Sequence, residues 1–275
     1  DDQHQVLARD AQRVFRRHEA ELRLRAAEQN LERLADVLTE QATALYDYKT
    51  KSLYLATWTP DDMQEFALVH ELAHAIADQL FDLGRYVKKS RSADSDLARS
   101  AVIEGQASWV MTEWLFQQTG RSLLDDPSLA AATAGASRYE ASNYPVYSAA
   151  PLYIRETMLF PYTDGLIFQQ RIVEKYGRRG FRMVFDTPPL TTRHVLTPES
   201  YLSDELPTKP SLPPLRQKGY ERISRGMIGQ LEHRILVEQY EGSREAADAL
   251  SRLWRGGRFE VHEDKDSDHA ILRYG

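Results

Sequence analysis

The stretch VHELAH at residues 69–74 contains two histidines and a glutamate in the pattern His-Glu-x-x-His. Residues four apart lie one turn apart on one face of a helix, so the imidazoles of His70 and His74 would point at a common position. Such a pair is typical of zinc ligands, and Glu71 can reach the open coordination position of the metal without binding the metal itself. The motif therefore predicts a zinc site in which Glu71 is a general base.

The sequence around the motif predicts a single helix. Thr59 offers an N-cap and Pro60 suits the first helical position, while Gly84 offers a C-terminal stop. The residues near the motif are small or apolar, which suits a buried site in a cleft; they include Phe66, Ala67, Ala73 and Ala77. The alternative interpretation is a solvated histidine pair on an amphipathic helix.

Two histidines leave one protein ligand of a catalytic zinc site missing. Leu80 stands six residues after His74, so the three-histidine pattern of metzincins is absent. The remaining common solution is a carboxylate from a second helix, and Glu104 lies in an apolar or small-sided stretch where an unpaired carboxylate would be costly. The adjacent Gly105 permits close approach of another helix. The alternative for Glu104 is an exposed acid or a buried salt bridge, and Glu113 is then the next candidate ligand.

That second helix is predicted from Asp96 as the cap to Gly120 as the stop. Helical spacing also gives two candidates for orienting the ligands, because a ligating histidine normally donates its other nitrogen to a carboxylate or a carbonyl. Asp78 follows His74 by one turn, and Ser108 follows Glu104 by one turn. Plain surface or packing roles are equally compatible with both residues.

Composition excludes several classes of function. The chain has 275 residues and no cysteine, which removes disulfides, thiolate metal sites, iron–sulfur clusters and cysteine nucleophiles. Lys and Arg number 35 against 41 Asp and Glu, so no overall positive charge favours nucleic acid or an anionic membrane surface. Apolar runs are far shorter than the roughly 20 residues that a membrane-spanning helix needs. The sequence predicts a globular protein without an integral membrane segment.

The rest of the chain divides into three predicted parts. Residues 1–42 read as a charged helical segment, residues 43–218 as a catalytic domain, and residues 219–275 as a small C-terminal α/β extension of helices and a hairpin. Within the second part, residues 44–58 predict a β-hairpin beside the motif helix. Residues 125–186 predict helices interrupted at three places, with later stops at two glycines: Asn143–Pro145, Pro151, Phe160–Tyr162, Gly177 and Gly180. Residues 187–217 contain seven prolines and predict a strap near the active site.

The stretch from His70 to Leu83, followed by Glu104-Gly105, resembles gluzincin metallopeptidases, in which a downstream helix supplies a glutamate ligand. The chain after Tyr46 also resembles a largely uncharacterised bacterial family of predicted exported zinc peptidases. The segments that carry this narrower likeness are Phe160-Pro161-Tyr162 with Gly165, Pro188-Pro189 with Thr191-Thr192, Pro198-Glu199 with Tyr201, and Trp254 with Gly257-Arg258. The strap departs from the family pattern at Arg193-His194 and at Thr197–Ser200.

The resemblance implies a helix-dominated, zincin-like α+β fold with a small sheet beside the active-site helix. We expect Zn²⁺ on His70, His74 and Glu104, and hydrolysis of peptide bonds in a peptide or protein substrate. Tyr162 and His194 are the candidates to stabilise the developing oxyanion. The alternative is an inactive gluzincin-like scaffold that binds zinc or protein partners. The resemblance, together with the absence of Met at position 1, gives the expectation of an exported protein.

Overall fold

The computed structural model describes residues 43–57, 60–267 and 269–275, so the predicted charged segment 1–42 and the predicted cap Thr59 lie outside the described residues. The elements follow one another as β1 (Ala44–Asp47), β2 (Ser52–Leu55), α2 (Asp61–Phe81), α3 (Leu83–Lys88), α4 (Ala93–Gln117), α5 (Ser128–Ala141), α6 (Pro145–Ala149), α7 (Leu152–Tyr176), α8 (Arg179–Asp186), α9 (Thr192–Leu196), α10 (Pro198–Leu202), β3 (Tyr220–Ile228), α11 (Gln230–Glu241), α12 (Arg244–Ser251), β4 (Gly257–Asp264) and β5 (Ala270–Tyr274).

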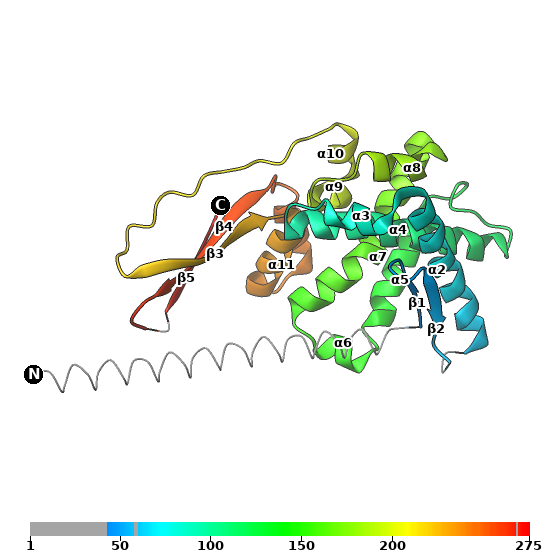
Figure 1. Ribbon diagram of the computed structural model, residues 1–275, viewed down its shortest axis with the longest axis horizontal. Helices are drawn as coiled ribbons and strands as arrows, with labels where there is room; N and C mark the ends of the chain where they lie inside the picture. Colours follow the sequence, from blue (N-terminus) through cyan, green and yellow to red (C-terminus); the bar gives the residue numbers. More distant parts are fainter. Residues whose placement is uncertain (1–42, 58–59, 268) are drawn as a thin grey trace, which may run out of the picture.

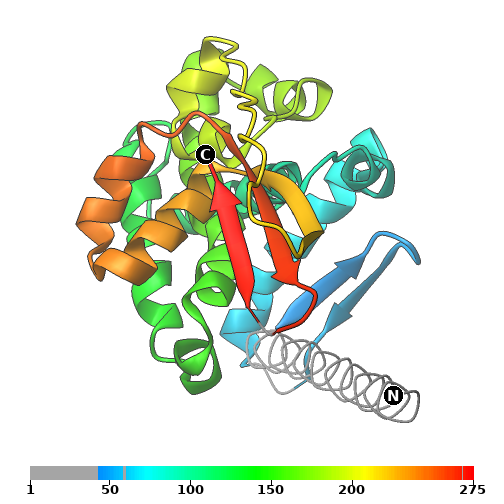
Figure 2. The same ribbon diagram turned by 90° about the vertical axis from the view of Figure 1, so that its left-hand side faces the viewer.

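The fold is a helical body with a small sheet at each end (Figure 1). The antiparallel β1–β2 hairpin lies beside α2, with Tyr46 paired to Leu53. The other sheet has the order β3-β4-β5 and lies beyond α11, as the turned view of Figure 2 also shows. The predicted helix-dominated α+β class is confirmed, as is the small sheet beside the motif helix.

The body is organised around the close crossing of α4 and α7. A Cβ added at Gly105 would lie 2.3 Å from the main chain of Gly165, and one added at Gly165 would lie 2.4 Å from the carbonyl oxygen of Ala101. Only glycine allows two helix backbones to approach so closely. The main core surrounds this crossing and includes the fully buried Phe160 and Phe168. The close helix approach predicted at Gly105 is confirmed.

Several predicted helix boundaries need correction. Helix α2 ends at Phe81, its C-cap Asp82 takes the left-handed conformation with φ 54°, and Gly84 lies inside α3. Asp82 can replace glycine here because its side chain accepts the Arg85 N–H. Helix α4 begins earlier than predicted, because Ser92 and Ser95 form a reciprocal cap.

The predicted break at Phe160–Tyr162 is wrong, since α7 runs continuously through Pro161. Proline removes one intrahelical hydrogen bond, but Phe160, Pro161 and Gly165 are all buried at the crossing with α4, and this packing outweighs the loss. The predicted breaks before Pro145 and at Pro151 are confirmed, as is the stop at Gly177, whereas Gly180 lies inside α8.

The C-terminal part contains a strand that the sequence analysis missed. Residues 220–228 form β3, and the predicted helix starts only at Gln230. The register of β3 on β4 shifts between Arg222 and Ser224, and this irregularity interrupts the alternation by which a strand is recognised. The predicted second helix and the C-terminal hairpin are confirmed as α12 and β4–β5.

The Pro-rich strap has two parts. Its first part forms the short helices α9 and α10, and its second part is extended and passes along the three-stranded sheet (Figure 1). The Thr208 N–H donates to the Arg255 carbonyl oxygen at 2.9 Å, and the Arg273 guanidinium donates to the Pro213 carbonyl oxygen. The extended part is therefore held by the C-terminal sheet, at the opposite end of the body from α2.

Among the described residues, no helix combines the length and the apolar character needed to cross a membrane.

Candidate metal centre

Three potential ligand atoms from two helices converge on one point. The Nε2 atoms of His70 and His74, both on α2, lie 3.0 Å apart. The Oε2 atom of Glu104 on α4 lies 3.2 Å from Nε2 of His70 and 3.1 Å from Nε2 of His74. The structure thus brings together the three residues that the sequence predicts as ligands, from positions 30 and 34 residues apart in the chain.

The triangle of ligand atoms has the size that a tetrahedral zinc ion requires. Ligands about 2.0–2.1 Å from zinc in a regular tetrahedron are about 3.3 Å from one another, and the three separations here are slightly shorter. Two imidazole nitrogens and one carboxylate oxygen also form a common catalytic zinc ligand set. His70 and His74 are 9% and 8% exposed, so the site is largely shielded from water. The ligand types, separations and burial of His70, His74 and Glu104 therefore fit a zinc ion.

The electrostatics of the cluster favour positive charge at the shared point. Burial lowers the pKa of His74, but the Glu104 carboxylate and its hydrogen bond more than offset burial, and the pKa is raised. Burial raises the pKa of Glu104, but the two imidazoles hold it well below its usual range. Both pKa shifts come from the attraction between the Glu104 carboxylate and the imidazoles. A carboxylate between two imidazoles binds a cation or a proton strongly.

Glu71 lies beside this triangle without being one of its corners. A carboxylate oxygen of Glu71 and ring nitrogens of His70 and His74 all lie within 4.8 Å of one another. Glu71 is 9% exposed, and its Oε2 accepts a hydrogen bond of 2.6 Å from the main-chain N–H of Tyr46 on β1. One oxygen of Glu71 is therefore held by the hairpin.

Tyr162 on α7 lies against the same cluster. Its ring stacks on that of His70, with centroids 6.0 Å apart and planes 25° apart, and its hydroxyl hydrogen-bonds Glu104. The negative charge of Glu104 and then burial raise the pKa of Tyr162 well above its usual value, so the phenol stays protonated and can donate. The residue as a whole is 44% exposed, so Tyr162 borders both the cluster and solvent.

His194, the other predicted oxyanion donor, is engaged elsewhere. Its Nε2 lies 2.7 Å from the carbonyl oxygen of Glu205, and its Nδ1 accepts from the Leu190 N–H at 3.3 Å. Burial lowers the pKa of His194. Main-chain groups of the strap occupy both ring nitrogens, so His194 is not free to donate to an oxyanion in this structure and instead holds the strap together.

The remaining candidates serve the fold. Glu113 accepts hydrogen bonds from Gln117, from Ser122 and from the Leu123 N–H at 2.7–2.8 Å, so it fixes the loop after α4 and is not placed as a ligand. Asp78 accepts its hydrogen bonds from the hairpin and from the N-terminus of α3, and none of them comes from His74. Ser108 is buried within α4.

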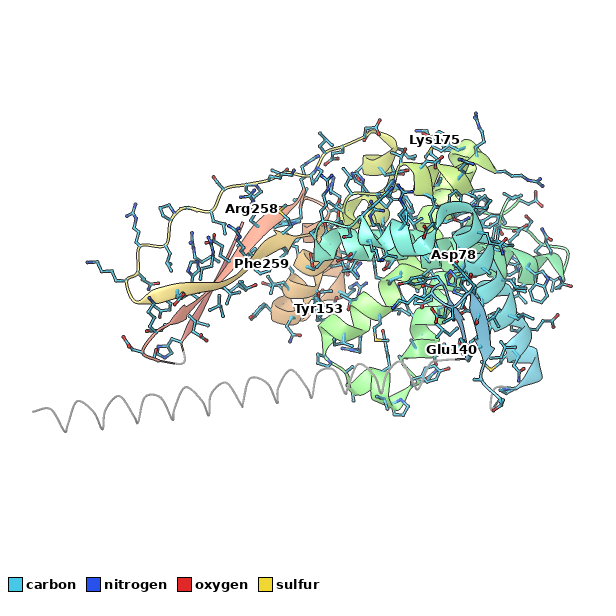
Figure 3. All side chains as sticks on the ribbon, viewed as in Figure 1. Asp78, Glu140, Tyr153, Lys175, Arg258 and Phe259 are labelled. Carbon is cyan, nitrogen blue, oxygen red and sulfur yellow. The ribbon has the colours of Figure 1, made fainter. Side chains whose placement is uncertain are left out.

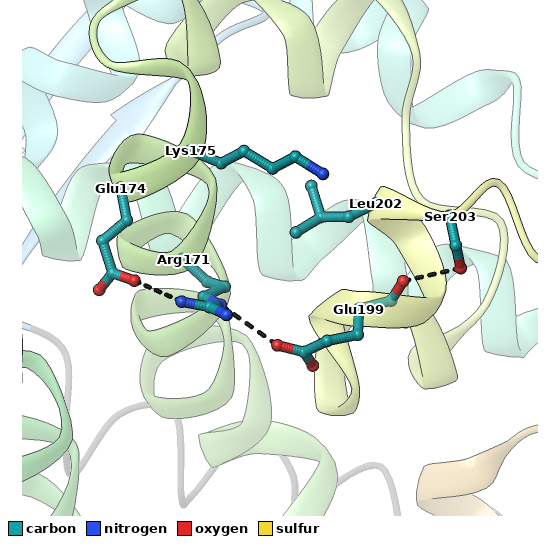
Figure 4. Close-up of a pocket in the computed structure, with 6 residues that line it drawn as sticks. All are labelled: Arg171, Glu174, Lys175, Glu199, Leu202 and Ser203. Carbon is teal, nitrogen blue, oxygen red and sulfur yellow. Dashed lines mark hydrogen bonds and ion pairs between the residues drawn. The ribbon is translucent and has the colours of Figure 1, made fainter.

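A hollow at the opposite end of α7 is not part of this site (Figure 4). Its charged lining is largely paired, because Arg171 bonds both Glu174 and Glu199. The lining residues are Arg171, Glu174, Lys175, Glu199, Leu202 and Ser203. They offer no metal-ligand set and no nucleophile with a neighbouring base.

Tyr46 belongs to the site, although its sequence context predicts only a strand residue. Its contact with Glu71 is made by the main-chain N–H, which every residue except proline possesses. No local pattern could have shown that this N–H meets the glutamate of the motif.

Comparisons with family models, with curated proteins and with solved structures find no match to this chain.

Proposed function

We propose that this chain is a zinc-dependent peptidase with a zincin-like fold of the gluzincin type. His70, His74 and Glu104 would hold the metal, and Glu71 would be the general base. The observation that carries the proposal is the convergence of the three ligand atoms at 3.0–3.2 Å from one another in a largely buried site. The likeness of the His70–Leu83 stretch and of Glu104-Gly105 to gluzincins supports the same assignment.

Zinc bound at this site would supply a water molecule whose pKa is lowered toward neutrality. Glu71 would accept the proton of that water as the oxygen attacks a peptide carbonyl, and would then pass the proton to the leaving amine nitrogen. The hydrogen bond from the Tyr46 N–H holds Oε2 of Glu71, which leaves Oε1 for this proton transfer.

Tyr162 is the residue best placed to donate a hydrogen bond to the developing oxyanion. Its ring lies against His70, its phenol stays protonated and the residue is partly exposed beside the cluster, so its hydroxyl would turn from Glu104 to donate to the oxyanion. Donors aimed at the position where negative charge develops are among the largest contributors to catalysis.

The hairpin offers a binding edge for an extended peptide. The Thr43 carbonyl accepts from Ala56 across the hairpin, whereas the Tyr46 N–H points away from β2 toward Glu71. Because main-chain groups alternate in direction along a strand, those of Ala44 and Tyr46 both point away from β2. The Tyr46 N–H is engaged by Glu71, so main-chain bonds from the rest of this edge would hold a peptide with little regard to its sequence. An exported location stays a prediction.

The proposal is tested by Glu71→Gln, with the matched control Glu140→Gln on the exposed surface of α5. Zinc content is measured by elemental analysis, and hydrolysis is measured on casein. We expect about one zinc per chain in all three proteins and a 10²–10⁴-fold loss of activity in Glu71→Gln only. The isosteric change removes the base and keeps the metal ligands.

Other outcomes separate the alternatives. Equal, nonzero activity in wild type and Glu71→Gln would reject Glu71 as the base. Zinc binding without hydrolysis of a peptide library by wild type would favour the inactive scaffold, and failure to bind zinc on reconstitution would reject the metal centre.

A further inference from the structure

We propose that Tyr46 is a positioning residue that fixes the carboxylate of Glu71 by attaching the β1–β2 hairpin to α2 at two points. The inference rests on the proposed function, because it assigns Tyr46 a part in setting the geometry of the base. It goes beyond that function because the second attachment point is Asp78, whose carboxylate bonds the hairpin and the start of α3 and lies two turns beyond Glu71 along α2.

The first attachment is the contact with the base itself. The Tyr46 N–H donates to Oε2 of Glu71 at 2.6 Å. A buried carboxylate needs such donors, because burial without a hydrogen bond is costly and leaves its orientation free. The orientation of Glu71 therefore depends on where the hairpin places residue 46.

The second attachment uses the side chain of the same residue. The Tyr46 hydroxyl donates to Oδ2 of Asp78 at 2.9 Å, and the Leu83 N–H donates to Oδ1 of Asp78 at 3.0 Å. Glu71 and Asp78 are seven residues apart and so lie on the same face of α2, about 10.5 Å apart along its axis. Tyr46 thus spans both positions, with its main chain on one and its hydroxyl on the other.

A lysine completes the second attachment. The Lys51 ammonium bonds Oδ2 of Asp78, whose side chain is fully buried, while the Lys51 side chain is 59% exposed. Figure 3 shows Asp78 on α2 where the helix faces the hairpin. The Lys51 ammonium, the Tyr46 hydroxyl and the Leu83 N–H together satisfy this buried carboxylate and hold its pKa below the usual value.

The hairpin turn is shaped to deliver that lysine. Lys51 has φ 55°, a left-handed conformation that a lysine rarely adopts. The side chain of Asp47 accepts from the Lys49 N–H at 2.8 Å and from the Thr50 hydroxyl at 2.9 Å, which closes the turn immediately before Lys51. A strained backbone kept in one conformation by an ion pair to a buried carboxylate is typical of a site where position matters.

The inference is tested by NMR on the zinc-loaded protein with ¹⁵N-labelled tyrosine, which gives a spectrum of 14 tyrosine amides. The Tyr46 signal is assigned by its loss in Tyr46→Phe. An amide that donates to a carboxylate resonates downfield, so Glu71→Gln should move this signal upfield. We expect Asp78→Asn to move it in the same direction, because the hairpin loosens at its second attachment.

Lys51→Met provides a second test of the same attachment, because it removes the ammonium that bonds Asp78, and thermal unfolding of the variant checks that it still folds. Tyr54→Phe is the matched control, because it removes a hydroxyl from the same hairpin at a 55% exposed position. We expect Lys51→Met to shift the Tyr46 signal and Tyr54→Phe to leave it unchanged. The inference would be overturned if the Tyr46 signal kept its chemical shift in both Asp78→Asn and Lys51→Met. It would also be overturned if the signal kept its chemical shift in Glu71→Gln.

Kinetics supply a readout that a purely structural role would not move. Tyr46→Phe keeps the main-chain donor and loses only the hydroxyl, so we expect kcat to fall about tenfold with KM and zinc content unchanged. Tyr54→Phe should match wild type. An unchanged kcat in Tyr46→Phe would overturn the inference while leaving the proposed function intact, whereas a wild-type protein without hydrolytic activity would reject the function itself.

Discussion

Two buried polar clusters in this molecule are built in opposite ways. In the cluster around α9, donors and acceptors are matched: Asp94 accepts from both the N–H and the hydroxyl of Thr192, and the same hydroxyl accepts from the Leu231 N–H at 3.1 Å. Arg193 donates to Gln230 and to two main-chain carbonyls. This α9 cluster ties the N-termini of three helices together and needs nothing further.

The metal centre is not matched in this way. Two imidazole nitrogens and a carboxylate oxygen face one another, so three atoms that can each accept a proton or a cation compete for one position. The histidines show the contrast, since the pKa of His74 is raised by Glu104 and that of His194 is lowered by burial. Buried polarity therefore indicates a ligand only where acceptors converge without their own donors.

The largest effect, on zinc affinity, is expected when Glu104 and Glu113 of α4 are each replaced by glutamine and the two variants are compared. Glu104→Gln replaces a charged ligand by a weak neutral one, and we expect zinc affinity to fall at least about 100-fold, with loss of activity. Glu113→Gln disturbs matched hydrogen bonds to the loop at Ser122 and Leu123, so it should lower the free energy of unfolding by about 1–3 kcal/mol. Zinc titration and urea unfolding of both variants measure these effects.

The contrast between the clusters would fail if the two variants behaved in the reverse way. Zinc retained in Glu104→Gln and lost in Glu113→Gln would make Glu113 the third ligand. Equal destabilisation with full zinc affinity in both variants would reduce the triangle of ligand atoms to an ordinary buried ion pair.

A smaller effect on zinc affinity is expected from a change at the crossing of α4 and α7, which places Glu104 near Tyr162. Gly105→Ala places a Cβ 2.3 Å from the main chain of Gly165, so the two helices must separate. We expect a loss of about 1–3 kcal/mol in the free energy of unfolding and a zinc affinity lowered about tenfold. Gly135→Ala on α5 is the control, because its Cβ would meet nothing within 4 Å and should stabilise the helix by about 0.5–1 kcal/mol.

Thermal unfolding of the two alanine variants measures the change in stability, and zinc titration measures the change in affinity. If Gly105→Ala unfolded and bound zinc like wild type, the close crossing would not be what positions Glu104.

The sequence predicts more of the metal centre than of the α9 cluster. His70, Glu71 and His74 lie within one helical turn, so their geometry follows from helix periodicity alone. Glu104 could be predicted as a ligand because a carboxylate next to glycine in an apolar helix is unusual. The partners of Asp94 and His194, by contrast, come from segments remote in the chain, and no local spacing shows that a strap residue such as His194 will find its acceptor at Glu205.

The fold shows the same division between local and long-range information. Helices with caps and periodicity are predictable from the sequence. Pro161 predicts a break because its cost is local, whereas its compensation, the packing of α7 on α4, is tertiary. The strand β3 was missed because its irregular register hides the alternation. Tyr46 acts through its main chain, which has no sequence signature.

The smallest effect on the metal centre is expected from titrating Glu232, a carboxylate next to the α9 cluster. Burial and the charge of Asp94 raise the pKa of Glu232 to about 7, although its Oε2 accepts the Gly229 N–H at 2.5 Å. Below about pH 4.5 the group is protonated in both folded and unfolded chains. Between pH 4.5 and 7 only the unfolded chain ionises, so stability falls as pH rises and levels off above 7, by on the order of 2 kcal/mol.

Glu232→Gln keeps the shape of the side chain and removes this titration. The difference in free energy of unfolding between wild type and Glu232→Gln should therefore change between pH 5 and pH 8 in favour of the variant, whereas zinc affinity at each pH should be the same in the two proteins. Urea unfolding across this range measures the first quantity and zinc titration the second. A parallel pH dependence in both proteins would show that Glu232 ionises normally in the fold. A zinc affinity that changed with Glu232 would join the two clusters, and the separation of structural from functional polarity would then no longer hold.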